Sequence, residues 1–511
     1  MSLSKTVNSF IRRQDLIHLA ILLVIALGIG VYIIATTVVI AKDGVFYIQQ
    51  AVRFSSEPQN VIKGLPCGYP FLIFAAHKLA ASLSGGSSLF TWIYSAQSIT
   101  LLCQLLALIP LYFIGKLLVG GRRSFQAIFI LIILPYPAEF VSDILREWPH
   151  MLFLASGFLF LIRGAKEGKC WMFGAAGLAA GLGHIIRPEC GQLIIYGALW
   201  IVIRLFSPKP PMSRPKLLCA LSVLLIGFAI PAAPYMTARG QFLPAKLKAL
   251  ISSTGHQESE EIREPETDSG NKIYLASVIP GKIAKAIGKL AGVMSENLMY
   301  FFVPPLLIGI YFRFRKKSSA TEIERFFVPA FVALNVVMLI TLYYSWGYIS
   351  RRHCFPLVVF TIFYVPIGLE VWAGWLADRF SKSRPASDKD RRLWFLILLI
   401  TGTAICMPKL FKHPGQDKQG YRTAAAWLSK YTAPQDLIAV PDSRITFYAE
   451  RKGLIYDTAT PATPTKAKYV VIIVRDESEK PDFAKDAKEE YSAWVDEHKK
   501  NKKLIIYKMP I

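Results

Sequence analysis

Long apolar runs separated by short basic loops are the feature that most constrains how this chain can fold. Each run is close to the ~20 residues that a helix needs to cross a bilayer. The runs lie at 16–38, 90–117, 125–141, 149–163, 170–185, 190–206, 217–235, 298–312, 326–346, 354–376 and 393–408. With 53% hydrophobic residues among 511, the chain is too apolar for a soluble protein of this size. The sequence therefore predicts a polytopic α-helical membrane protein with about eleven transmembrane helices.

The formal net charge of +24 would suggest a nucleic-acid partner in a soluble protein. In this chain the basic residues instead fill alternate loops, which the positive-inside rule assigns to the cytoplasm. They are Lys5, Arg12, Arg13, Lys116, Arg122, Arg123, Arg163, Lys166, Lys169, Arg204, Lys209, Arg214, Lys216, Arg313, Arg315, Lys316, Lys317, Arg325, Arg379, Lys382, Arg384, Lys389, Arg391 and Arg392. The N-terminus is then cytoplasmic, an odd number of spans places the C-terminus outside, and no nucleic acid is expected.

Two segments of the predicted outer face are long. In the first loop, about 39–89, residues 44–54 and 71–84 are predicted as helices lying on the membrane interface. The second, about 236–297, has an acidic middle from His256 to Asp268. That middle is either a solvated loop or a lid that orders over a bound substrate.

The composition turns soluble at about residue 409. Short apolar runs typical of strands alternate there with amphipathic helical stretches. We expect helices at 421–431 and 445–450, and strands at 437–440, 453–456, 469–474 and 504–507. The sequence therefore predicts a transmembrane domain over 1–408 and a small α/β extracytoplasmic domain over 409–511.

Acidic residues stand at two places on the predicted outer face. Asp43 lies at the outer end of the first span, and Asp143 and Glu147 lie one helical turn apart about a hundred residues later. Ionisable groups at a membrane boundary are rare and usually functional. Each acid is either a helix cap or local ion-pair partner, or a general base that takes a proton from an attacking hydroxyl.

Four arginines break the positive-inside pattern. Arg146, Arg187, Arg351 and Arg352 all fall at outer helix ends. Arginine binds phosphate through a planar fork and keeps its charge, so the four together favour a lipid-phosphate site. Alternatively each snorkels or pairs locally, Arg187 with Glu189 and Arg146 with Asp143 or Glu147.

Several short motifs accompany these charges. They are Gly68-Tyr69-Pro70 before an apolar helix, Gly177 to Glu189 ending in Arg-Pro-Glu, Arg352-His353 through Pro356, and Ala426-Trp427-Leu428 with Ala449-Glu450-Arg451 in the tail. Together with the acid past the first helix, this pattern resembles the glycosyltransferase C (GT-C) superfamily. It is most similar to the family 39 type, which includes protein O-mannosyltransferases and the lipid A aminoarabinose transferase.

The resemblance implies an inverting transferase in the inner membrane of a bacterium, with its C-terminal domain in the periplasm. The implied donor is a sugar on a polyprenyl monophosphate, and the acceptor is a lipid, glycan or protein. By position Asp43 matches the catalytic acid, and either Asp143 or Glu147 matches the second acidic position. The family often works without a metal, so none is required, although some relatives use a divalent cation.

Two other functions are compatible with a polytopic helical protein. A transporter or flippase of a lipid-linked glycan usually carries charges near the bilayer midplane and repeated halves. In this sequence the charges gather at helix ends and no internal repeat is present. A non-catalytic scaffold leaves the outer arginines unexplained.

Overall fold

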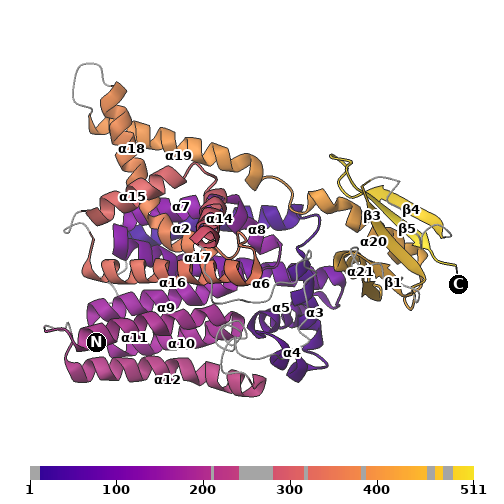
Figure 1. Ribbon diagram of the computed structural model, residues 1–511, viewed down its shortest axis with the longest axis horizontal. Coiled ribbons are helices and arrows are strands. Elements are labelled where there is room, and N and C mark those ends of the chain that lie inside the picture. The colour runs from indigo at the N-terminus through magenta and orange to yellow at the C-terminus, as the bar shows by residue number, and fades with distance from the viewer. Residues whose placement is uncertain are drawn as a thin grey trace.

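Helices run side by side through most of the computed structural model, and a small sheet lies at one end (Figure 1). The structure describes residues 12–208, 212–240, 280–315, 320–380, 387–456, 467–475 and 487–510. The acidic segment His256–Asp268 lies outside the described residues. So do Lys5, Lys209, Lys316, Lys317, Lys382 and Arg384 of the basic loops.

All eleven apolar runs are largely helical, although 125–141 and 354–376 are divided among successive helices. This confirms a multi-pass helical membrane protein. The bundle consists of α2 (Arg13–Thr36), α6 (Leu89–Val119), α7 (Gly121–Ile133), α8 (Pro135–Ser142), α9 (Glu147–Glu167), α10 (Cys170–Ile186), η1 (Pro188–Gly191) with α11 (Gln192–Leu205), α12 (Arg214–Arg239), α14 (Pro280–Asn297), α15 (Val303–Arg315), α16 (Glu322–Trp346), α17 (Phe355–Thr361), η2 (Ile362–Tyr364), α18 (Val365–Phe380) and α19 (Asp388–Leu410).

The count of eleven spans is not confirmed. Among the described residues, eight helices are long and apolar enough to cross a membrane, or nine if α7 and α8 form one bent span. The bend of 59° falls where Pro135 follows Leu134, because the residue before a proline is disfavoured in helical geometry. The helices α10 and α15, with 17 and 13 residues, are shorter than the others.

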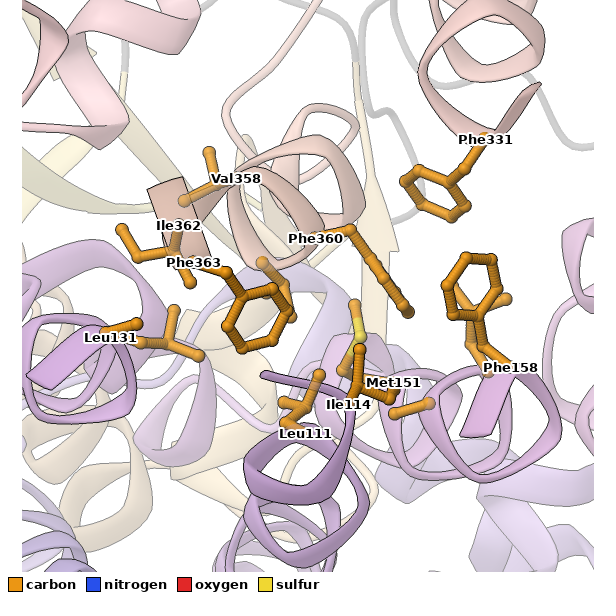
Figure 2. Packing of buried hydrophobic residues seen from close by; sticks show 14 of the residues in the cluster. Leu111, Ile114, Leu131, Met151, Phe158, Phe331, Val358, Phe360, Ile362 and Phe363 are labelled. Atoms are coloured by element: carbon orange, nitrogen blue, oxygen red, sulfur yellow. The ribbon is translucent and has the colours of Figure 1, made fainter. Parts of the chain in front are cut away.

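Aromatic and aliphatic side chains fill the centre of the bundle. Rings of Phe158, Phe331 and Phe360 meet there with centroids 4.3 to 5.7 Å apart (Figure 2). Phe363 and Met151 extend the same cluster toward α7 and α9. These helices contact other helices on several sides, which explains why their sequences are apolar on more than one face.

Glycines bring two helices of the bundle close together. A Cβ atom at Gly177 of α10 would lie 2.1 Å from the Leu224 carbonyl oxygen of α12, and one at Gly227 would lie 2.4 Å from that of Gly174. Small residues of this kind let helix backbones approach in membranes. The glycine- and alanine-rich sequence of α10 is therefore a packing surface against α12.

Three short helices fill the segment between α2 and α6. They are α3 (Lys42–Arg53), α4 (Pro58–Gly64) and α5 (Gly68–Ser84). The first and third correspond to the predicted interfacial helices, whereas α4 was not predicted. Tyr47 of α3 packs against Tyr69 of α5 with ring centroids 5.1 Å apart, and the Tyr69 hydroxyl lies 2.7 Å from that of Thr100 in α6. This contact anchors α3 to the bundle.

The C-terminal region confirms the predicted small α/β domain. It contains α20 (Gln419–Tyr431), α21 (Ser443–Ala449) and the strands β1 (Ile438–Val440), β2 (Gly453–Ile455), β3 (Tyr469–Val474), β4 (Lys488–Trp494) and β5 (Lys503–Lys508). The strand order is β2-β1-β3-β5-β4, with β1 parallel to β2 and β3, and β5 antiparallel to β3 and β4. The sequence analysis missed β4, which begins with three charged residues and has no buried residue, as is typical of an edge strand.

This domain docks onto the connection between α2 and α3. The Val38 amide donates to the Pro414 carbonyl at 2.9 Å, and the Ile40 amide donates to the Tyr448 hydroxyl at 3.1 Å. Gly415 has a φ of 71°, and a Cβ there would lie 2.1 Å from the Val39 carbonyl oxygen. Glycine is therefore needed at residue 415 for both the turn and the close approach. The docking places α21 against α3, the helix that carries Asp43.

Candidate active site

Charged residues from four connections between helices lie close together in the structure. The start of α3 carries Asp43, and the α8–α9 turn carries Asp143, Arg146 and Glu147. The end of α10 carries Arg187. The residues before α17 include Arg351 and Arg352.

The carboxylate of Asp43 contacts the guanidinium of Arg352. The Nη1 of Arg352 donates to Oδ2 of Asp43, and the side chains of Arg352 and Asp43 are 33% and 30% exposed respectively. Asp43 is the second residue of α3 rather than the end of α2, which stops at Thr36. The structure thus joins two of the predicted residues across 309 positions of sequence and leaves both within reach of solvent.

Helix α3 is pressed against the α8–α9 turn. A Cβ atom at Gly44 would lie 2.4 Å from the Asp143 carbonyl oxygen, so only glycine allows this approach. The next residue, Ile144, is fully buried with a φ of 59°, a left-handed conformation that is strained for a β-branched side chain. The expectation that Asp143 and Glu147 share one helical turn is therefore wrong, because the helical conformation is interrupted at Ile144, between α8 and α9.

Asp143 has an unusual protonation equilibrium. Burial raises the pKa of Asp143 from its ordinary 3.8 to about 7, the charge of Glu139 adds to this rise, and Lys418, Arg444 and Arg352 oppose it. A carboxyl group with a pKa near neutrality can both accept and hold a proton at the working pH. Asp143 is thus suited to proton transfer.

Glu147 is buried and faces Arg187. The Nη1 of Arg187 lies 3.4 Å from Oε1 of Glu147, and its Nε lies 3.4 Å from Oε2 of Glu189. The other oxygen of Glu147 has no hydrogen-bond partner among the described residues. The local Arg187–Glu189 pair expected as an alternative is therefore present, and Glu147 holds the same guanidinium from a second side.

The remaining two arginines have no carboxylate within ion-pair distance in the described ranges. Burial lowers the pKa of Arg146, but Tyr47, Glu189 and Glu147 raise it, with a net rise. The guanidinium of Arg351 instead lies 4.0 Å from the ring centroid of Tyr136 in α8, where the Lys409 ammonium also lies 3.9 Å away. The four arginines thus divide into a group around Glu147, comprising Arg146, Arg187 and Arg352, and a separate Arg351.

Sequence reasoning missed a charged residue that the C-terminal domain brings to the site. Arg444 is buried, donates to both oxygens of Asp442 at 2.8 and 2.6 Å, and its positive charge lowers the pKa of Asp143. No local pattern marks Arg444, because its proximity to Asp143 depends on how the domain docks. Tyr47 was likewise unrecognised within an amphipathic helix.

The acids do not form a metal-binding set. In the stretches that the structure describes, no three or more His, Cys, Asp or Glu side chains are placed to share a metal ion. Glu147 is instead directed to Arg187.

Comparison with known proteins places this arrangement in context. Residues 69–233 match a family model described as dolichyl-phosphate-mannose-protein mannosyltransferase. ArnT from Cupriavidus metallidurans bound to undecaprenyl phosphate is similar, with a TM-score of 0.56 and 12% identity over 95% of this chain and 97% of that one. Archaeal oligosaccharyltransferase AglB from Archaeoglobus fulgidus, in complex with an inhibitory peptide and a dolichol-phosphate, gives 0.51 and 14% over 90% and 69%. No curated protein matches by sequence. At these identities the structures establish the fold.

Proposed function

We propose that this chain, by its fold a member of the GT-C superfamily of membrane glycosyltransferases, is an inverting transferase. Its donor is a sugar on a polyprenyl monophosphate, and its acceptor is a hydroxyl group on a lipid, glycan or protein. The matching family is named for a dolichyl-phosphate sugar. The similar ArnT and AglB structures contain undecaprenyl phosphate and dolichol-phosphate. These names support the class of donor.

The observation that carries the proposal is the contact between Asp43 and Arg352, close to Arg146, which has no carboxylate within ion-pair distance among the described residues. In the proposed step the acceptor oxygen attacks the anomeric carbon while its proton passes to Asp43. The bond from that carbon to the phosphate oxygen breaks, and its electron pair stays on the phosphate. A glycosylated acceptor and a polyprenyl phosphate are the products. The base and the cations that receive the leaving group are thus adjacent.

The arginines around Glu147 have different roles in this step. Arg146 is the best candidate for a direct phosphate ligand, because it can bind a phosphate without first breaking an ion pair with a described carboxylate. Arg187 and Arg352 already bind carboxylates, so they add positive charge near the phosphate and orient Glu147 and Asp43. Asp143 supplies a second carboxyl able to exchange protons near neutral pH. Arg351 can contact the donor phosphate only if its side chain moves away from the ring of Tyr136. No metal is required.

The proposal includes the orientation and location of the protein. The basic loops support a cytoplasmic N-terminus. We place the chain in a bacterial inner membrane, with the C-terminal domain in the periplasm. Lys499→Cys places a thiol at an exposed position of that domain. We expect an impermeant maleimide to label it in intact spheroplasts. Labelling only after lysis would contradict this orientation.

The decisive experiment is incubation of the purified chain in nanodiscs with a polyprenyl-phosphate sugar. We expect release of polyprenyl phosphate and an inverted anomeric configuration in the product. Intact donor after incubation with a range of acceptors would contradict the enzyme. The transporter alternative is not favoured, because the charges gather at helix ends and the sequence contains no internal repeat. Donor movement across liposomes without cleavage would support a transporter instead.

A further inference from the structure

A second polar site lies where the C-terminal domain meets the bundle. A pocket of about 380 Å³ opens between the amino end of α6 and helices α20 and α21. The polar and aromatic residues that line it are Phe90, Arg422, Ser429, Lys430, Tyr448 and Glu450. None of these residues takes part in the transfer step proposed above.

Two positive charges in this pocket have no acidic partner. The guanidinium of Arg422 lies 5.5 Å from the ring centroid of Phe90 and 5.9 Å from that of Tyr448. Lys430 is exposed, and its ammonium lies 5.2 Å from the ring of Tyr431. Neither cation has a carboxylate within ion-pair distance in the described part of the chain. The Nη1 of Arg422 donates to the Val38 carbonyl at 3.2 Å. The remaining N–H groups of Arg422 and the Lys430 ammonium are available to an acidic ligand.

The other lining groups suit a saccharide. The rings of Phe90 and Tyr448 offer flat apolar faces to the C–H side of a sugar. The Ser429 hydroxyl and the Glu450 carboxylate offer hydrogen bonds to sugar hydroxyls. An aromatic surface with a few convergent polar groups is typical of a small-molecule site. A lining with two cations and a carboxylate does not suit an acyl chain.

The pocket shares a wall with the candidate active site. Tyr448, which lines the pocket, accepts a hydrogen bond from the Ile40 amide at 3.1 Å, three residues before Asp43. Ile40, Val45 and Ile144 belong to one buried cluster against which Phe447 and Tyr448 pack. A ligand anchored by Arg422 and Lys430 therefore lies next to the helix that carries the general base.

We propose that this pocket binds the acceptor through a sugar that carries an acidic group, a phosphate or a carboxylate. The inference rests on the proposed function, because only a transferase has an acceptor. The cations assigned to the donor come from the α8–α9 turn, α10 and the start of α17. Those of the pocket come from α20. Donor and acceptor are thus held by separate positive charges from different elements.

The test measures binding of soluble probes to the full-length chain in nanodiscs of neutral phosphatidylcholine. Trehalose 6-phosphate and cellobiouronic acid provide the phosphate and carboxylate forms, and trehalose is the neutral control. Lys430→Glu reverses one charge on an exposed side chain, so domain docking should be preserved. Arg422→Ala removes the second charge. Lys452→Ala, at an exposed position of the same domain, is the matched control.

We expect at least one acidic disaccharide to bind tenfold or more tightly than trehalose. Lys430→Glu and Arg422→Ala should each weaken that binding about tenfold, the size of one charge-assisted hydrogen bond, and Lys452→Ala should leave it unchanged. Equal binding of acidic and neutral probes, or no loss in Lys430→Glu, would overturn the inference. Loss of probe binding when phosphatidylglycerol is added to the discs would also overturn it, by assigning the pocket to a lipid head group.

Donor cleavage by the unaltered chain separates this inference from the proposed function. If the protein cleaves the polyprenyl-phosphate sugar but binds no acidic disaccharide, the proposed function stands and the assignment of the pocket is wrong. If the protein binds the disaccharide at this pocket but never cleaves the donor, the proposed function is wrong.

Discussion

Replacing Asp43 by asparagine tests the centre of the proposed mechanism. Asparagine keeps the size of the side chain and a hydrogen-bond acceptor for Arg352, but it cannot take a proton from the acceptor hydroxyl. Loss of a general base typically costs ~10²–10⁴ in rate. This corresponds to roughly 3–5.5 kcal/mol on the activation barrier at ~1.36 kcal/mol per decade.

The effect on folding should be far smaller than the effect on rate. The side chains of Asp43 and Arg352 are 30% and 33% exposed, and exposed ion pairs contribute only about 0–1 kcal/mol to stability. We therefore expect Asp43→Asn to express and unfold almost as the unaltered protein does. Asp417→Asn, at an exposed position outside this contact, is the matched control for removal of a carboxylate.

The assay is single-turnover release of sugar from a labelled polyprenyl-phosphate donor, with donor binding measured separately. Transfer should fall by at least about a hundredfold in Asp43→Asn and remain near normal in Asp417→Asn. Because the two side chains are in contact, Arg352→Ala combined with Asp43→Asn should cost less than the sum of the single changes. Near-normal turnover in Asp43→Asn at saturating donor would refute the assignment of this base.

Three further changes test other parts of the site. The pKa of Asp143 is raised from 3.8 to about 7, so the folded chain retains this proton where the unfolded chain has lost it. Stability should then fall as pH rises from about 4 to 7, and a thermal-unfolding series should show a flatter profile in Asp143→Asn; identical profiles would contradict the shift. Arg146→Ala should weaken donor binding about tenfold or more and Arg351→Ala less, as titration with donor would show; the reverse order would place the phosphate beside Tyr136. In Gly44→Ala the new Cβ would lie 2.4 Å from the Asp143 carbonyl oxygen and must displace it, which should cost ~1–3 kcal/mol of stability and reduce transfer. Gly28→Ala, where the new Cβ has no atom within 4 Å, should change neither stability nor transfer. Equal effects of the two changes on melting temperature and activity would contradict the close packing at Gly44.

The sequence alone determined the class of fold. Whether a segment crosses a bilayer depends on the length and polarity of a continuous run, which are local properties. The short strands and helices of the C-terminal domain were likewise visible in local periodicity. Only the number of spans exceeded what the described helices support, because α10 and α15 are short and Pro135 bends α7 away from α8.

The sequence also identified most candidate site residues, because charges at the wrong end of membrane helices are conspicuous. Their pairing was decided only by tertiary structure. Arg352 contacts Asp43 across 309 residues, Arg351 turns to Tyr136, and Arg444 acts on Asp143 from another domain. No local rule predicts such contacts, because they depend on where helix ends meet after packing. The left-handed Ile144 has the same origin: tertiary contacts on both sides hold a backbone conformation that a β-branched residue would otherwise avoid.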